Sequence, residues 1–235
     1  MPPDHPWPDC TPPRVLVKVC GLTSVAEARA ALAAGADWIG LNFHPASPRS
    51  VSPDAARAIV EALDEPARAV GLFVDRPASE VAAIARDVGL TTVQLHGHEP
   101  PEDYVALSGL RLIRAYRLSD EASVAAMILD LERSASLGRT PDAVLVDAHV
   151  PGLMGGTGHS IAVDLFRLLP PLPRLILAGG LTPANVAERA ALIRPWMVDT
   201  ASGVESAPGR KDPALVSTFI AAARAGWVSA GHVAR

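Results

Sequence analysis

The sequence alternates short apolar runs with Ala-rich segments in which apolar residues recur at helical spacing. Apolar runs of about five to eight residues without polar alternation are typical of parallel strands buried on both faces. We therefore predict strands at residues 14–19, 37–43, 68–74, 91–96, 110–116, 143–147, 174–178 and 196–201.

A helix is predicted after each strand. Several of these helices carry start signals: Ser52 and Thr182 each precede a proline, and Ser24 is followed three residues later by Glu27. A side-chain hydroxyl at the N-cap and proline at the first helical position both favour helix initiation. The predicted helices span residues 24–34, 53–63, 78–88, 100–107, 120–137, 160–169, 183–191 and 213–225.

Strand–helix units repeated in this way predict a single-domain (β/α)8 barrel (TIM barrel) of the α/β class. An open doubly wound sheet is the alternative architecture. Residues 14–226 form the predicted barrel, and residues 227–235 form a C-terminal tail. Residues 1–13 are Pro-rich and are interpreted as an irregular N-terminal arm, because proline cannot sit inside a helix or donate a backbone hydrogen bond.

Composition narrows the function classes. The chain has 21 Lys and Arg against 25 Asp and Glu, a net charge of −4, which argues against nucleic acid or an anionic membrane as a partner. We find no apolar stretch of about 18 residues and no secretory signal. The two cysteines, Cys10 and Cys20, have neither disulfide-framework nor zinc-site spacing, so we expect a cytoplasmic protein without a structural metal.

In a barrel of this kind, chemistry is expected at the C-terminal ends of the strands. Cys20 ends the first predicted strand, and Lys18 lies on the same side of that strand. A nearby cation favours thiolate, so we expect a thiol pKa below about 8.5; a buried small residue is the alternative interpretation. Asp147 ends the sixth strand and is the candidate acid, with Asp199, at the end of the eighth, as its rival.

Glycine segments follow the last two strands. Gly179 and Gly180 come after the seventh strand, and Ser202 and Gly203 come after the eighth. Backbone N–H groups approach a phosphate closely at glycine, and barrel enzymes commonly bind phosphate at these two loops. We therefore predict a phosphate site there.

Three other rim segments carry candidate residues. Gly156 and Thr157 belong to a glycine-rich loop after the sixth strand that matches no nucleotide-binding fingerprint. Arg49 follows two prolines in the second loop and suits bidentate carboxylate binding, although a solvated surface arginine is the alternative. His96 ends the fourth strand, as either a packed histidine or a substrate contact.

Taken in order, seven of these segments resemble the phosphoribosylanthranilate isomerase family of tryptophan biosynthesis. The resemblance runs from about residue 15 to residue 222 without a large insertion. Its segments are VKVCGLT (17–23), GLNFHPASPRSV (40–51), VGLFVD (70–75), VQLHGHE (93–99), GGTG (155–158), LAGGLTPANV (177–186) and VDTASGVESAPGRKD (198–212).

The resemblance implies a cofactor-independent Amadori rearrangement of a small phosphosugar. Cys20 would be the general base, Asp147 the general acid and Arg49 the contact for the anthranilate carboxylate. The phosphate role would fall on the glycine segments after the seventh and eighth strands. The family's reaction needs neither metal nor organic cofactor. The sequence leaves open whether the chain is a monomer or a homodimer.

The chain departs from the family pattern around the sixth loop: GGTG is followed by His-Ser-Ile-Ala-Val-Asp-Leu, and Ala148 stands where Ser or Thr is frequent. Two alternatives are related barrels, either an isomerase that also accepts the histidine-pathway aminoaldose or an inactive phosphate-binding relative. The former reaction usually employs paired aspartates after the first and sixth strands, so Cys20 argues against it.

Overall fold

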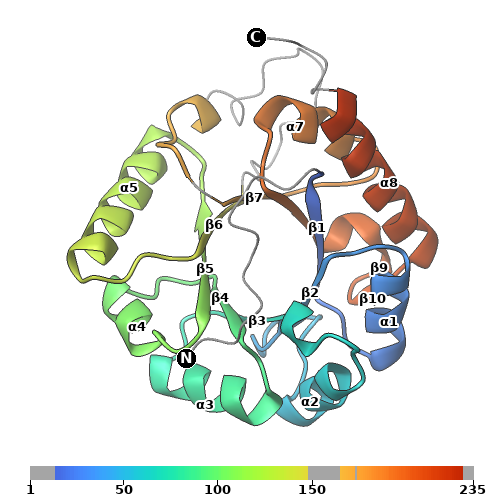
Figure 1. Ribbon diagram of the computed structural model, residues 1–235, viewed down its shortest axis with the longest axis horizontal. Helices are drawn as coiled ribbons and strands as arrows, with labels where there is room; N and C mark the ends of the chain where they lie inside the picture. Colours follow the sequence, from blue (N-terminus) through green and yellow to red (C-terminus); the bar gives the residue numbers. More distant parts are fainter. Residues whose placement is uncertain (1–13, 148–164, 173, 230–235) are drawn as a thin grey trace.

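Eight parallel strands close into a barrel that the helices surround (Figure 1). The computed structural model describes residues 14–147, 165–172 and 174–229. Each strand is hydrogen-bonded to the next in sequence, and β8 returns to pair with β1. The predicted fold class is therefore confirmed.

The strands follow the predicted positions closely. They are β1 Leu16–Cys20, β2 Trp38–Asn42, β3 Ala69–Phe73, β4 Thr92–Leu95, β5 Arg111–Arg117, β6 Ala143–Asp147, β7 Leu175–Ala178 and β8 Met197–Thr200. The helices are α1 Val25–Ala33, α2 Pro53–Glu61, α3 Ala78–Val88, α4 Pro101–Ala106, α5 Glu121–Ser136, α7 Val186–Ile193 and α8 Pro213–Ser229. Two short 3-10 turns are η1 Pro66–Arg68 and η2 Ser202–Val204.

The sixth predicted helix is only partly described, with helical residues at 165–167. A feature that the sequence analysis did not predict is the hairpin after β8, made of β9 Glu205–Ala207 and β10 Arg210–Lys211. Three-residue and two-residue strands are too short to produce a recognisable hydrophobic period.

Helix initiation follows the predicted capping chemistry at α1 and α2. The Ser24 and Ser52 hydroxyls accept hydrogen bonds from backbone N–H groups three residues later. The prediction for Thr182 is wrong: α7 begins at Val186, and the Asn185 side chain instead accepts from the Thr182 N–H. The chain completes a turn before this helix begins.

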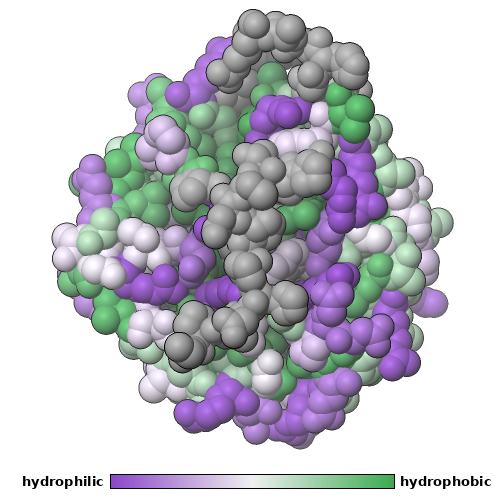
Figure 2. Space-filling model, viewed as in Figure 1, coloured by the Kyte–Doolittle hydropathy of each residue, from purple (hydrophilic) through white to green (hydrophobic). Residues whose placement is uncertain are grey.

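The strands carry buried apolar residues on the helix-facing side, and most of the interior packs as one apolar cluster between strands and helices. On the face shown in Figure 2, hydrophilic residues are interspersed with hydrophobic ones around the ring of helices. The side of β1 that carries Lys18 is also buried, although its residues are not all apolar. This polar interior is the foundation of the site described below.

Helix α8 extends beyond the expected domain boundary at residue 226. Trp227, assigned to the tail from the sequence, is 6% exposed and belongs to the main apolar cluster. The Arg194 guanidinium lies 4.0 Å from the centre of the Trp227 ring and donates a hydrogen bond to the Trp227 carbonyl. The last turn of α8 is therefore part of the packed barrel.

We expect Trp227→Ala to lower the free energy of unfolding by about 3–5 kcal/mol, the usual cost of truncating a buried tryptophan. Chemical denaturation followed by circular dichroism measures this loss. The adjacent Val228 is 63% exposed and supplies the control, because Val228→Ala should change stability by less than about 0.5 kcal/mol. Equal effects of the two substitutions would contradict the assignment of Trp227 to the core.

Candidate functional site

A cavity of about 300 Å³ opens at the C-terminal ends of the strands. Its lining draws residues from every barrel strand except β5 and from several of the loops that follow the strands. Every predicted site residue within the described ranges lines it: Cys20, Arg49, His96, Asp147, Gly179, Gly180, Ser202 and Gly203. Gly156 and Thr157 lie outside the described residues.

Cys20 is the last residue of β1 and is 6% exposed. Space for its sulfur comes from the neighbouring strand, where a Cβ on Gly40 would lie only 2.6 Å from Cys20 Sγ. Close packing against Cys20 thus explains why position 40 is a glycine, which the sequence analysis did not identify. Any larger residue at position 40 would displace the thiol.

Lys18 is fully buried, and its Nζ lies 2.9 Å from Asp199 Oδ2. Burial raises the pKa of the Cys20 thiol; Lys18 opposes that rise, whereas the Asp199 carboxylate adds to it. The expected depression of the thiol pKa is therefore wrong. The ammonium of Lys18 was the reason for that expectation, but its charge is shared with a carboxylate that the sequence does not place beside it.

The two rival carboxylates have different environments. Asp199 is bound to Lys18 and its side chain is 8% exposed, whereas the Asp147 side chain is 24% exposed at the end of β6. Asp147 Oδ2 lies 3.9 Å from His96 Nε2. Around the ring, β7 and β8 separate Asp147 from Cys20, and both side chains line the cavity.

His96 is presented as a neutral side chain. Burial lowers its pKa to about 4, against the opposing effect of Asp147. Nδ1 of the ring lies 3.0 Å from Gln94 Nε2, and an amide nitrogen can only donate. Nδ1 therefore accepts, and the ring proton is on Nε2, which has no hydrogen-bond partner among the described residues.

The glycine loops have conformations suited to close backbone approach. Gly179 and Gly180 have φ values of 95° and 61°, in the left-handed region that side chains disfavour. Gly203 lies in η2, where an added Cβ would lie 1.9 Å from the Leu181 carbonyl oxygen. This contact holds the loop after β8 against the loop after β7. Glycine at position 203 is therefore required for packing, in addition to the predicted approach of a phosphate to its backbone.

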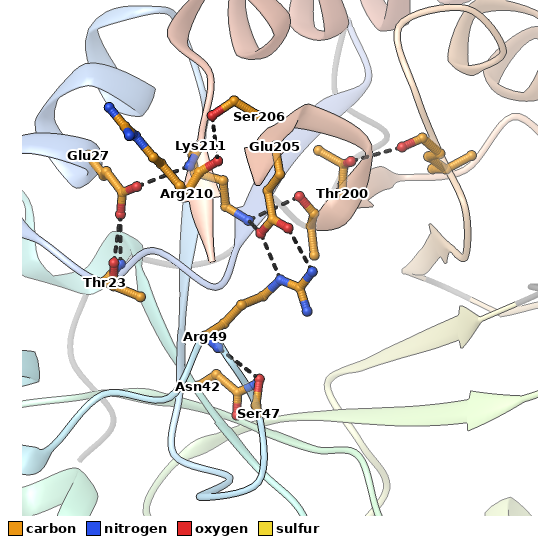
Figure 3. A network of polar contacts seen from close by, with 12 residues as sticks. Thr23, Glu27, Asn42, Ser47, Arg49, Thr200, Glu205, Ser206, Arg210 and Lys211 are labelled. Atoms are coloured by element: carbon orange, nitrogen blue, oxygen red, sulfur yellow. Dashed lines mark hydrogen bonds and ion pairs between the residues drawn. The ribbon is translucent and has the colours of Figure 1, made fainter. Parts of the chain in front are cut away.

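Arg49 reaches the cavity but is held by a residue that the sequence analysis did not single out. Its Nε and Nη2 donate to the two carboxylate oxygens of Glu205, each at 2.7 Å (Figure 3). Lys211 Nζ also donates to Glu205, at 2.7 Å. The interpretation of Arg49 as a solvated surface residue is thus incorrect. The available signal was that acidic Glu205 and basic Arg210 and Lys211 lie close together in the 198–212 segment.

Within residues 14–147, 165–172 and 174–229, no group of three or more His, Cys, Asp or Glu side chains is arranged to hold a metal ion. None of the helices there combines the length and apolar character that crossing a membrane requires.

Known proteins resemble this chain over most of its length. A family model described as N-(5'-phosphoribosyl)anthranilate (PRA) isomerase matches residues 17–222. The isomerase of that name from Geobacter sulfurreducens is 45% identical over 213 residues, which cover 91% of this chain and all of the relative. The one from Chlorobium luteolum is 40% identical over 215 residues, which cover 89% of this chain and 97% of the relative.

Solved structures agree in fold. Phosphoribosyl anthranilate isomerase in complex with reduced 1-(o-carboxyphenylamino)-1-deoxyribulose 5-phosphate has a TM-score of 0.75 and 32% identity, and the match covers 89% of this chain and 98% of that one. The enzyme from Thermus thermophilus has a TM-score of 0.71 and 34% identity, over 88% and 98% of the respective chains. A family model over most of the barrel and relatives above 30% identity show that this chain belongs to the N-(5'-phosphoribosyl)anthranilate isomerase family.

Proposed function

We propose that this chain isomerises N-(5'-phosphoribosyl)anthranilate to 1-(2-carboxyphenylamino)-1-deoxyribulose 5-phosphate in tryptophan biosynthesis, with Cys20 as base and Asp147 as acid. The observation that carries the assignment of roles is that one cavity is lined by this thiol, this carboxylate, a guanidinium and two glycine loops. We also place the enzyme in the cytoplasm, because its two cysteines lack the spacing of a disulfide framework.

The chemistry requires two proton transfers on one sugar. Asp147 donates a proton to the ribose ring oxygen as the bond from that oxygen to the anomeric carbon breaks, and the aminobenzoate nitrogen supplies the electron pair that forms the iminium. Cys20 thiolate then removes the proton from the neighbouring carbon. The resulting enolamine tautomerises to the ketone, and neither step changes the oxidation state of a protein group.

Three other groups would bind the ends of the substrate. Arg49 faces the ring carboxylate, and the backbone N–H groups of the glycine loops face the phosphate. His96 would donate its Nε2 proton to a substrate oxygen near Asp147, because its ring is neutral and that N–H has no acceptor among the described residues. The thiol at the end of β1 does not match the paired aspartates of the dual-substrate reaction, so we do not propose that reaction.

Turnover tests the proposal directly: phosphoribosyl anthranilate generated in situ should lose its fluorescence when the enzyme is added. Cys20→Ser should abolish turnover while the protein stays folded by circular dichroism, because a serine hydroxyl is far less acidic than a thiol. Since burial raises the pKa of the Cys20 thiol, kcat/KM of the wild type should still be rising at pH of about 8.5. A serine variant within about tenfold of wild type, with the same pH dependence, would place the base elsewhere.

Asp147→Asn should reduce kcat by at least about a hundredfold, the lower range for loss of a general acid. It should leave the binding of reduced 1-(o-carboxyphenylamino)-1-deoxyribulose 5-phosphate intact. The comparison is Asp199→Asn, which removes the partner of a buried ammonium and should cost about 3–5 kcal/mol of stability. Activities are compared per folded molecule. If folded Asp199→Asn loses more activity than Asp147→Asn, the assignment of the acid is wrong.

The His96 ring should titrate at about pH 4 and remain neutral in the neutral range. Proton NMR of the imidazole C–H signals measures the midpoint, and the signal that disappears in His96→Gln identifies the residue. Exposed His98, whose side chain is 95% accessible, provides an internal comparison in the same spectra. A His96 midpoint near 6.5 would contradict the predicted effect of burial on this pKa, and a midpoint above the neutral range would contradict the neutral-donor role.

A further inference from the structure

The hairpin β9–β10, in the segment after β8, contacts the loop after β2 and the start of α1. Glu205 binds Arg49 of the loop after β2, and the Lys211 N–H donates to Glu27 Oε1 at the start of α1 (Figure 3). The other Glu27 oxygen accepts from the N–H and hydroxyl of Thr23, in the loop after Cys20. Gly209, at the hairpin turn, lies so close to the Pro48 carbonyl that a Cβ would approach its oxygen to 2.5 Å.

Arg49 is held at both its stem and its head. A Cβ on Gly21, the residue after Cys20, would lie 2.5 Å from Arg49 Cδ, so the arginine stem packs directly on that glycine. At the guanidinium head, Nε and Nη2 donate hydrogen bonds to the Glu205 carboxylate. Among the described residues, nothing occupies the guanidinium edge that carries Nη1, so this edge is left for a ligand. A planar fork already fixed in position loses little conformational entropy when it binds a carboxylate.

The register of the hairpin also sets the net charge of the cluster formed by Arg49, Glu205 and Lys211. Lys211 and Glu205 are cross-strand partners, and Lys211 Nζ donates to both Glu205 Oε1 and the Ala201 carbonyl. Burial alone would raise the pKa of Glu205, but the hydrogen bonds from Arg49 and Lys211 outweigh it and hold that pKa below its ordinary value. Glu205 is therefore an anion between two cations, and the cluster keeps a net charge of +1.

Without Lys211, the Glu205 charge would cancel that of Arg49. The Lys211 and Glu205 side chains are only 3% and 5% exposed, so water screens this balance weakly. We infer that Glu205 is a positioning residue for Arg49 and that Lys211 is a specificity residue, which together make the cavity select substrates with a ring carboxylate. The inference rests on the proposed function and adds two residues to it.

Glu205→Gln separates positioning from simple electrostatics, because the two effects have opposite signs. Removing an anion beside Arg49 would by itself strengthen carboxylate binding, whereas releasing the arginine weakens it. We expect the KM for phosphoribosyl anthranilate to rise about tenfold, the scale of one lost charge-assisted contact, with kcat changed less than about threefold.

The same selectivity should appear in binding. The probes are reduced 1-(o-carboxyphenylamino)-1-deoxyribulose 5-phosphate and its phenyl counterpart without the carboxylate. Glu205→Gln should weaken the first about tenfold and the second less than about twofold. Unchanged or tighter binding of the carboxylate ligand, or equal losses for both ligands, would overturn the positioning role.

Lys211→Met tests the charge separately, because it leaves the Arg49–Glu205 contact in place. The carboxylate ligand should bind about five- to tenfold more weakly, whereas its phenyl counterpart should bind less than about twofold more weakly. An unchanged carboxylate affinity, or equal losses for the two ligands, would overturn the role of Lys211.

Asp37→Asn is the matched control. Asp37 forms a comparable bidentate pair with Arg14 and has a 15% exposed side chain, but it precedes β2 at the opposite end of the barrel. This variant should lose stability without changing KM or ligand selectivity. If Glu205→Gln behaves in the same way, the inference fails. If wild-type enzyme does not turn over phosphoribosyl anthranilate, the proposed function itself fails, so the two failures are distinguishable.

Discussion

Closure of the barrel through β1 and β8 is the constraint on which the candidate site depends. The register of that pairing sets Lys18 opposite Asp199, and their side chains meet at 2.9 Å inside the barrel. A buried ion pair recovers its desolvation cost only in good geometry, and removing one partner leaves a charge without compensation. The ion pair therefore favours this strand register over a shifted one. It also places two charged groups beside Cys20 in the barrel interior.

The Lys18–Asp199 ion pair gives the two carboxylates different environments. Asp199 is occupied by Lys18, whereas Asp147 stands at the cavity beside neutral His96. The same burial raises the pKa of the Cys20 thiol, so its thiolate, once formed, is a stronger base than an exposed one. In the proposed reaction, the scarcity of thiolate at neutral pH is offset by greater basicity toward the sugar carbon.

The hairpin after β8 holds the residues on the Arg49 side of the cavity in place. It holds Arg49 through Glu205 and reaches the loop after Cys20 through Glu27, so the proposed carboxylate-binding group and the proposed base share one set of contacts. The packing of Arg49 on Gly21 makes that connection direct. In the proposed reaction, substrate orientation by Arg49 and proton abstraction by Cys20 would depend on this one set of contacts at the rim.

Local sequence pattern determined the order and type of the elements and the residues at the strand ends, because hydrophobic period and capping chemistry act over a few positions. It also placed Cys20, Asp147 and Arg49 at one rim. Only the tertiary structure decided that Lys18 pairs with Asp199, 181 positions away, and that Glu205 holds Arg49 across 156 positions. The raised thiol pKa and the charge of the Arg49 cluster follow from these contacts, because burial and charge pairing depend on neighbours that strand closure brings together.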